Sequence, residues 1–326
     1  MNHTVSLLTL LTFIVPAMGQ VNESINQASY SQVAMSGITD HFYNWLNSQG
    51  YGGYDFARDD LSGGSYGGKT GNNDPIQHDP VIFIHGNSDK AVGTGFGQTG
   101  WAESIAYFKN NGYTDAELYA TTWGPADAAN ASDQYHSREH LTRIRAFIEA
   151  VLQYTGATRV DIISHSMGVT LARKAIKGGS AHDAADGGYY NLGSSLTGSI
   201  DTFVGIAGAN LGLTTCYLSG PTTPTCGSTN GLYPGYLYWG LGPYGVSDML
   251  DDINTSSGYE GSYVYTIWST VDEIIGYGNL VYGSYTSRIP GQDGEKVYTS
   301  VPYGHFNSKD LTAYYQLRMV RDHAVN

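Results

Sequence analysis

Residues 161–169, DIISHSMGV, place two serines and a histidine where an apolar run ends. The apolar run predicts a buried strand, and the residues from Met167 onward predict a helix. A sharp strand-to-helix turn raises the side chain at its centre above a sheet, and it needs small residues two positions before and after. Ser164 and Gly168 meet this requirement. We therefore predict that Ser166 is an exposed nucleophile.

A nucleophilic serine also needs hydrogen-bond donors for the negative charge that develops on a substrate oxygen. The backbone N–H of Met167 would lie at the start of the predicted helix, where the helix dipole favours negative charge. Residues 81–87, VIFIHGN, predict a strand followed by a His-Gly turn, and such a turn can supply a second backbone donor. The sequence thus predicts an oxyanion hole formed by the N–H groups of Asn87 and Met167.

The order Ser, acid, His along the chain restricts the remaining partners. Asp272 comes two residues after a predicted strand, with Glu273 as its rival, and His305 lies between a later strand and the last helix, with His323 as its rival. In this arrangement His305 takes the proton of Ser166 and returns it to the leaving alcohol, while Asp272 orients the imidazole ring. Three further acids precede that strand and come too early: Asp248, Asp251 and Asp252.

Strands and helices that could position these residues alternate along the chain. Short apolar runs predict buried strands, and apolar residues at three- and four-residue spacing predict helices. Their alternation predicts an α/β fold, with a mostly parallel sheet and helices on both faces. The expected strands are residues 81–84, 116–121, 159–163, 199–208, 262–270 and 296–301, and the expected helices are residues 99–112, 141–155, 167–177 and the residues from about 308 onward.

The N-terminal segments are predicted to have different roles from the main domain. Residues 7–15 form an apolar run of signal-peptide length that is too short to span a bilayer. A possible helix near residues 30–47 leads into a glycine-rich stretch, which suggests an irregular arm over the main domain or a flexible linker. The predicted organisation is residues 1–19 as a signal peptide, 20–79 as the arm, and 80–326 as the main domain with an irregular cap-like insertion at about 209–260.

The signal-peptide-like run at the N-terminus predicts a secreted protein, and the charge argues against nucleic-acid partners. The net charge is −13 and only 16 residues are Lys or Arg, so clustered cations for phosphate are lacking. No later stretch is apolar for long enough to cross a membrane, and we expect a monomer. Secretion favours a disulfide between Cys216 and Cys226, although two free buried thiols are the alternative. Three Asn-x-Ser/Thr sites could carry glycans: Asn22, Asn130 and Asn254.

Two other motifs indicate different chemistry. Residues 136–140 fit the H-x-x-E-H spacing of zinc peptidases, and they lie on a predicted helix, where both histidines could share a face. A solvated start of that helix is the preferred interpretation. No sequence context provides a third ligand, so we predict no metal site. Residues 95–100 fit G-x-G-x-x-G, but they begin about ten residues after the strand, which does not suit a dinucleotide turn. A glycine-rich loop at the rim of the site is the preferred interpretation.

Together these residues resemble the class 2 lipase family, the compact bacterial lipases with an A-H-S-M-G motif, and extracellular polyhydroxybutyrate depolymerases. The similarity extends from about Asp79 to Arg318. It is strongest in PVIFIHGN, QYTGATRVDIISHSMGV and LTTCYLSGPTTPTCGS. The resemblance implies an α/β-hydrolase fold and ester hydrolysis without metal or cofactor. Carried over by motif, the implied roles are a triad of Ser166, Asp272 and His305, with Asn87 and Met167 as oxyanion donors.

The expected function is secreted hydrolysis of carboxylic esters of lipids, with the ester or lipid met in solution or at an interface. A polyester depolymerase is one alternative, and a catalytically inactive binding protein on the same scaffold is another. Residues 232–244, LYPGYLYWGLGPY, are aromatic and uncharged, and we hypothesise that they contact the acyl chain or polymer. Ordinary packing of tyrosines against glycine-rich loops is the other interpretation of this stretch.

Overall fold

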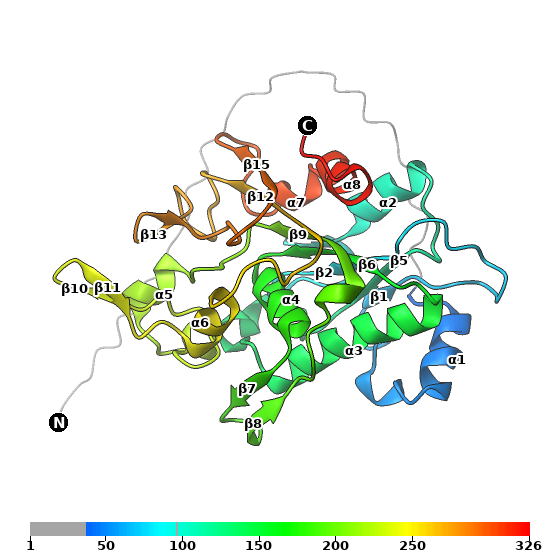
Figure 1. Ribbon diagram of the computed structural model, residues 1–326, viewed down its shortest axis with the longest axis horizontal. Helices are drawn as coiled ribbons and strands as arrows, with labels where there is room; N and C mark the ends of the chain where they lie inside the picture. The colour runs from blue at the N-terminus through cyan, green and yellow to red at the C-terminus, as the bar shows by residue number, and fades with distance from the viewer. Residues whose placement is uncertain (1–36, 96) are drawn as a thin grey trace, which may run out of the picture. The chain divides into compact units, whose positions relative to one another are not determined.

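A seven-stranded sheet forms the centre of the computed structural model, which describes residues 37–95 and 97–326 (Figure 1). Its strands are β1 (Ser65–Tyr66), β2 (Val81–Ile84), β5 (Leu118–Thr121), β6 (Val160–His165), β9 (Ile200–Ile206), β12 (Tyr263–Ser269) and β15 (Gly294–Tyr298). They lie in the order β1-β5-β2-β6-β9-β12-β15. The first pair is antiparallel and every other neighbouring pair is parallel, which confirms the predicted α/β fold.

Apolar side chains leave the strands alternately toward two cores, as the two-residue period of a strand requires. On β2, Ile82 packs in the core of one face, whereas Val81 and Phe83 pack in the core of the other. One face is covered by α1 (Asp40–Ser48), α3 (Arg138–Thr155), α4 (Met167–Lys177) and α6 (Asp248–Asn254), and the opposite face by α2 (Ala102–Asn110) and α8 (Ala313–Asp322) (Figure 1).

Local signals set the ends of these helices. Ser137 caps α3 by accepting a hydrogen bond from the backbone N–H of His140 at 3.1 Å, and Gly156 ends the helix at φ 73°. α4 begins directly after its N-cap residue, Ser166. The helix expected from about residue 308 is divided into two, α7 (Asn307–Asp310) and α8.

The described part of the N-terminal arm, residues 37–79, is built into the main fold. Phe42 and Leu46 of α1 are buried in the same core as α3, and β1 extends the central sheet at the outer edge of β5. A short 3-10 helix, η1 (Gly52–Tyr54), lies between these two elements. The arm therefore supplies core side chains and an edge strand, and the described residues, 37–95 and 97–326, belong to one compact unit.

The insertion at about residues 209–260 contains short elements where no periodicity predicted any. Its helix α6 buries Met249, Leu250 and Ile253 against α4, which explains how this glycine-rich segment is held. The insertion comprises α5 (Thr214–Ser219), η4 (Pro224–Cys226), a hairpin of β10 (Tyr236–Tyr238) and β11 (Leu241–Tyr244), and α6. Further elements are the hairpins β3–β4 (Val92–Gly95, Gln98–Gly100), β7–β8 (Ser180–Asp183, Gly188–Asn191) and β13–β14 (Leu280–Val281, Ser284–Tyr285), with η2 (Ala128–Asp133) and η3 (Thr197–Ser199).

Across residues 37–95 and 97–326, no helix has both the length and the apolar character needed to cross a membrane.

Candidate active site

Ser166 lies on a strained turn between β6 and α4. Its φ of 55° and ψ of −129° are unusual for a residue with a side chain, and such a conformation costs about 1–3 kcal/mol. The surroundings leave no room for larger neighbours. A Cβ added at Gly168 would lie 2.3 Å from the carbonyl oxygen of His85, and one added at Gly86 would lie 2.8 Å from Cβ of Ser166. Close packing of the loop after β2 therefore holds the serine in place.

The ring of His305 lies between Ser166 and Asp272. Its Nε2 is 3.0 Å from Oγ of Ser166, and its Nδ1 is 2.9 Å from Oδ2 of Asp272. Asp272 is fully buried, and its Oδ1 also accepts backbone hydrogen bonds from Ile274 at 2.9 Å and Ile275 at 2.7 Å. These bonds to backbone N–H groups fix the orientation of the carboxylate. Two of the three side chains that the sequence predicted as a triad, Ser166 and Asp272, are thus each within hydrogen-bonding distance of the ring of the third, His305.

The two rival residues occupy other positions. Glu273 accepts a hydrogen bond from the backbone N–H of His305 at 2.9 Å, so it holds the main chain of that residue and not its ring. His323 lies 2.9 Å from Asp201, which is at the amino end of β9. The amino ends of parallel strands lie at the opposite edge of the sheet from Ser166, so His323 is remote from it.

Each of the two predicted oxyanion donors lies next to a residue that adjoins Ser166, or is part of the chain directly after it. Met167 is the first residue of α4, and Asn87 follows Gly86 in the loop that contacts Ser166. Within the described residues, neither backbone N–H donates a hydrogen bond to the protein. The side chain of Asn87 is engaged elsewhere, because its Nδ2 donates to the carbonyl oxygen of Ala131 at 2.8 Å. Both backbone groups are therefore available to an acceptor near Ser166.

Two buried histidines bond to backbone groups next to the predicted site residues, and no pattern in the sequence assigns either of them a role. His85 stacks on Trp123, donates from Nδ1 to the carbonyl oxygen of Gly86 at 2.7 Å, and accepts from the backbone N–H of Trp123 at Nε2. Burial lowers the pKa of His85 from 6.5 to about 3, so its ring is neutral. His165 donates from Nε2 to the carbonyl oxygen of His305 at 3.1 Å, and burial holds its pKa well below the usual value.

The cysteines and the sequons lie in different environments. Cys216 and Cys226 form a disulfide that joins α5 to η4. Asn130 is exposed in η2, whereas the side chain of Asn254 donates to Asn210 and accepts from Arg173. Asn22 lies outside the described residues.

The H-x-x-E-H motif does not place both of its histidines on a helix, because the Ser137 cap starts α3 at Arg138. His136 precedes that helix and contacts the carbonyl oxygen of Asn230 and the hydroxyl of Thr170. Its burial lowers its pKa to about 3. In the part of the chain that the structure describes, no group of three His, Cys, Asp or Glu side chains is arranged to hold a metal ion.

In the glycine-rich stretch at residues 95–100, Gly95 ends β3 and Gln98–Gly100 form the antiparallel strand β4, with α2 beginning at Ala102. The stretch therefore lies in a hairpin and does not join a strand of the parallel sheet directly to a helix, as a dinucleotide turn would. Gln98, in β4, donates from Nε2 to the carbonyl oxygen of Ser88 at 2.8 Å. The hairpin therefore contacts the loop that carries Asn87, which agrees with its interpretation as a rim of the site.

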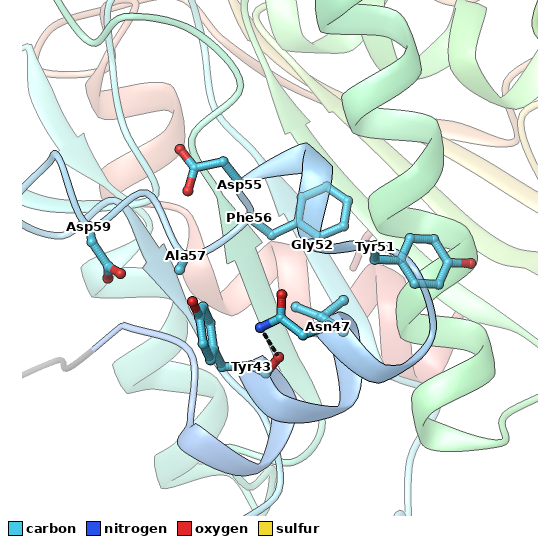
Figure 2. A pocket seen from close by; sticks show the side chains of 9 residues that line it. Tyr43, Asn47, Tyr51, Gly52, Asp55, Phe56, Ala57 and Asp59 are labelled. Carbon is cyan, nitrogen blue, oxygen red and sulfur yellow. Dashed lines mark hydrogen bonds between the residues drawn. The ribbon is translucent and has the colours of Figure 1, made fainter.

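A separate small pocket lies beside α1 (Figure 2). Its volume of about 70 Å³ is too small for an acyl chain, and among the described residues its lining includes none of the predicted site residues. It is lined by Tyr43, Leu46, Asn47, Tyr51, Gly52, Asp55, Phe56, Ala57 and Asp59.

The mostly parallel sheet, covered by helices on both faces and carrying a serine at the tight turn after β6, defines an α/β-hydrolase. The sequence model of the family described as lipase (class 2) matches residues 78–318. Because this match covers well over half of the chain, the chain belongs to the class 2 lipase family. It is a carboxylic ester hydrolase of the lipase and esterase type.

Similar solved structures include lipase B of Aspergillus fumigatus, at 14% identity and a TM-score of 0.45, with 75% of this chain and 50% of that chain covered. This chain thus spans half the length of the Aspergillus lipase. A structure from the metagenome-derived lipolytic enzymes LipS and LipT has 14% sequence identity and a TM-score of 0.47, with 81% of this chain and 99% of that chain covered. Bacillus licheniformis lipase BlEst2 has 12% sequence identity and a TM-score of 0.45, with 78% of this chain and 96% of that chain covered.

Proposed function

We propose that the protein is a secreted serine hydrolase that cleaves carboxylic esters of lipids through an acyl-enzyme intermediate. Ser166 is the nucleophile, His305 is the general base and acid, and Asp272 holds the imidazole in the reactive tautomer. The backbone N–H groups of Asn87 and Met167 form the oxyanion hole.

In the first half of the reaction, Oγ of Ser166 attacks the ester carbonyl while Nε2 of His305 accepts its proton. The carbonyl oxygen becomes an oxyanion, which accepts hydrogen bonds from Asn87 and Met167. Collapse of this intermediate breaks the bond to the alcohol, which leaves with the proton from His305. In the second half, His305 removes a proton from water, the hydroxide attacks the acyl-serine, and the acid is released as Ser166 regains its proton.

The observation that carries this proposal is the alignment of the three side chains, with 3.0 Å between His305 and Ser166 and 2.9 Å between His305 and Asp272. The test is labelling with a fluorophosphonate, together with hydrolysis of p-nitrophenyl butyrate. We expect stoichiometric labelling of the wild-type chain. In Ser166→Ala we expect no labelling and a loss of kcat of about 10⁶-fold. Equal activity in the two proteins would refute the proposal, and a wild-type chain without labelling would favour an inactive binding protein.

Secretion is part of the proposal. The Cys216–Cys226 disulfide is compatible with an oxidising compartment, and Asn130 is an exposed glycan acceptor. We propose residues 1–19 as the signal peptide, 20–79 as an N-terminal arm and 80–326 as the hydrolase domain. The described part of the arm, residues 37–79, packs on that domain. N-terminal sequencing of the protein from the medium tests the cleavage site, since a mature chain that still begins at Met1 would contradict it.

An exposed apolar surface supports a water-insoluble substrate. Large apolar side chains are exposed on the β10–β11 hairpin, on α5 and on the loop after Asp272, which lie on one side of the molecule in Figure 1. The hydroxyl of Thr214 donates to the carbonyl oxygen of Leu280, and the ring of Tyr217 packs on that of Tyr282, so α5 contacts the loop after Asp272. The hydroxyl of Tyr282 donates to the carbonyl oxygen of Gly235, which directly precedes β10. We call these residues the aromatic face: Tyr217, Leu218, Tyr236, Leu237, Tyr238, Trp239, Leu241, Tyr244, Ile274, Tyr277 and Leu280.

The charge distribution indicates what kind of surface the aromatic face suits. In a chain of net charge −13, no Asp, Glu, Lys, Arg or His lies between Asp201 and Asp248, and none lies between Glu273 and Arg288. Trp239 is 88% exposed and Tyr277 79% exposed. Exposed rings without charges suit an uncharged, condensed ester better than a charged partner.

This face is also the observation that favours polyester hydrolysis as a second candidate function. A panel of p-nitrophenyl esters, emulsified triacylglycerol and polyhydroxybutyrate films, with Ser166→Ala as the control, distinguishes the two. Release of fatty acids from the emulsion without release of acid from the film supports the lipase. The reverse pattern supports the depolymerase.

A further inference from the structure

Lys309 is a fully buried cation four residues after His305. Its Nζ donates hydrogen bonds to Oγ1 of Thr99 at 2.7 Å, to the carbonyl oxygen of Gly100, and to Asp310 at 2.6 Å. It also lies over the ring of Trp101, 5.4 Å from its centre. A buried ammonium group costs several kcal/mol in desolvation unless such contacts offset it. These contacts hold a buried cation on the segment that carries His305, which suggests that they have a role in positioning that segment.

The other end of this contact reaches the loop that carries Asn87. Asp89 is buried, and its Oδ1 accepts the backbone N–H groups of Lys90 at 2.8 Å and Gly100 at 3.0 Å. Its Oδ2 has no hydrogen-bond partner among the described residues, and it lies 3.6 Å from Nζ of Lys309. Gly100 is thus bonded to Asp89 through its N–H and to Lys309 through its carbonyl oxygen.

We propose that Lys309 and Asp89, acting through β4, form a strut that sets the position of the Asn87 N–H relative to Ser166 and His305. Lys309 is then a positioning residue for the reaction, and it touches neither substrate nor reacting atoms. The inference rests on the proposed function, because the separation of the oxyanion donor from the imidazole matters only if Ser166 is a nucleophile that generates an oxyanion. It also gives a role to the glycine-rich stretch at residues 95–100, whose final residues supply both contacts.

A matched control exists on α4. Lys174 is also a buried lysine, with its Nζ bonded to the carbonyl oxygens of Gly178 and Ser180 and to Asp252. These partners lie at the end of α4 away from Ser166. Replacement of either lysine by Met removes a buried ammonium group that is paired with an aspartate, although Asp252 is more exposed than Asp89 and Asp310. Of the two lysines, only Lys309 links the segment that carries His305 to the loop that carries Asn87.

The experiment compares Lys309→Met and Lys174→Met in the full chain. Active sites are titrated with a fluorophosphonate, and kcat and KM for p-nitrophenyl butyrate are expressed per titrated site. The inhibition constant of a trifluoromethyl ketone reports on the oxyanion hole. For Lys309→Met we expect kcat to fall about 10- to 100-fold, the inhibition constant to rise by a similar factor, and KM to stay within about twofold. For Lys174→Met we expect kcat per site within about twofold of wild type, even if Tm falls equally.

Wild-type kcat per titrated site in Lys309→Met would overturn the strut, and so would equal losses in both variants. If Lys309→Met does not fold, Asp89→Asn takes its place. It keeps an oxygen for the Gly100 N–H and removes the charge, and it should show the same split between kcat and KM. Failure of the proposed function is read separately, because it appears as an absence of fluorophosphonate labelling in the wild-type chain.

Discussion

The segments around Ser166 and the insertion at residues 209–260 follow neighbouring strands, β6 and β9, but they are constructed in opposite ways. Around Ser166, charged groups such as Asp272 and Lys309 are fully buried and bonded to their neighbours. The insertion has no charge before Asp248, and it exposes its rings to solvent. Buried hydrogen bonds are directional, so they hold the site side chains in one orientation. The hydrophobic attraction between exposed rings and an apolar surface is not directional, so it requires no single orientation.

Arg173 of α4 joins the two regions. Its guanidinium is fully buried, bonded to Glu260 at 2.9 Å, to Asn210 at 3.0 Å and to the carbonyl oxygen of Ile253 at 2.8 Å. The insertion is therefore anchored on the helix that begins next to Ser166. The comparison indicates that one region positions the site side chains and the other provides an apolar surface for substrate. Helix α4 connects the two regions through Arg173.

The largest effect is expected where the buried carboxylate is altered. Asp272→Asn should lower kcat for p-nitrophenyl butyrate by about 10⁴-fold, because the amide favours the wrong imidazole tautomer. Glu273→Gln is the matched control, since it touches only the backbone of His305, and it should cost far less. Stopped assays with titrated active sites measure both. A larger loss in Glu273→Gln than in Asp272→Asn would show that the two acids have been assigned the wrong way round.

Removal of the disulfide tests whether the insertion is separable from the site. The double variant Cys216→Ser/Cys226→Ser should lose about 3 kcal/mol of unfolding free energy, because a short loop is no longer closed in the unfolded chain. With Ser166 and His305 untouched, kcat on a soluble ester should stay near the wild-type value. Denaturant unfolding and kinetics at 20 °C check the two parts, and a parallel loss of kcat would contradict the separation.

His136 lies where the two regions meet, and its burial makes the contact sensitive to acid. Its pKa falls from 6.5 in the unfolded chain to about 3 in the folded protein, so the unfolded chain binds the extra proton between these values. Stability is therefore fully present above about pH 6.5 and is lost as pH falls, by about 2 kcal/mol between pH 7 and pH 5. His136→Gln should be less stable at pH 7 but should show a smaller decline on acidification. Denaturant unfolding at pH 7 and pH 5 measures this. If the unfolding free energy of His136→Gln falls between the two pH values by as much as that of the wild type, the contribution of His136 is disproved.

The smallest effect is expected on the aromatic face, and it should depend on the substrate. Tyr236→Ser/Tyr238→Ser/Trp239→Ser should lower turnover of an emulsified or solid ester about tenfold, because adsorption loses apolar contact area. Turnover of p-nitrophenyl butyrate in solution should remain unchanged. The measurement is the ratio of turnover on the emulsified or solid ester to turnover on p-nitrophenyl butyrate. If this ratio is the same in the variant and in the wild-type chain, the aromatic face has no separate role in adsorption.

Much of the site could be predicted because its residues follow strands that short apolar runs reveal. The carboxyl ends of parallel strands share one edge of a sheet, so Ser166, Asp272 and His305 could be brought together from chain order alone. Asn87 and Met167 followed from their places next to a strand end and a helix start. The fold followed from the alternation of strands and helices.

Other features leave no trace in a linear pattern. Lys309 and Thr99 are 210 residues apart, and no periodicity links a lysine to a distant threonine. β1 has two residues, too few to show a two-residue period. His136 was expected on a helix, but the cap at Ser137 excludes it, because a local side-chain bond decides where α3 begins.

The pairing of β1 with β5 bears on how the protein can be trimmed or tagged. Ser65 and Tyr66 cover the outer margin of β5, opposite Thr121 and Ala120. A fragment beginning after residue 66 would leave those backbone groups bare, and a bare strand recruits other chains into aggregates. A purification tag placed ahead of residue 37 leaves the pairing of β1 with β5 intact. Expression trials should therefore keep residues 37–66 and add the tag before them.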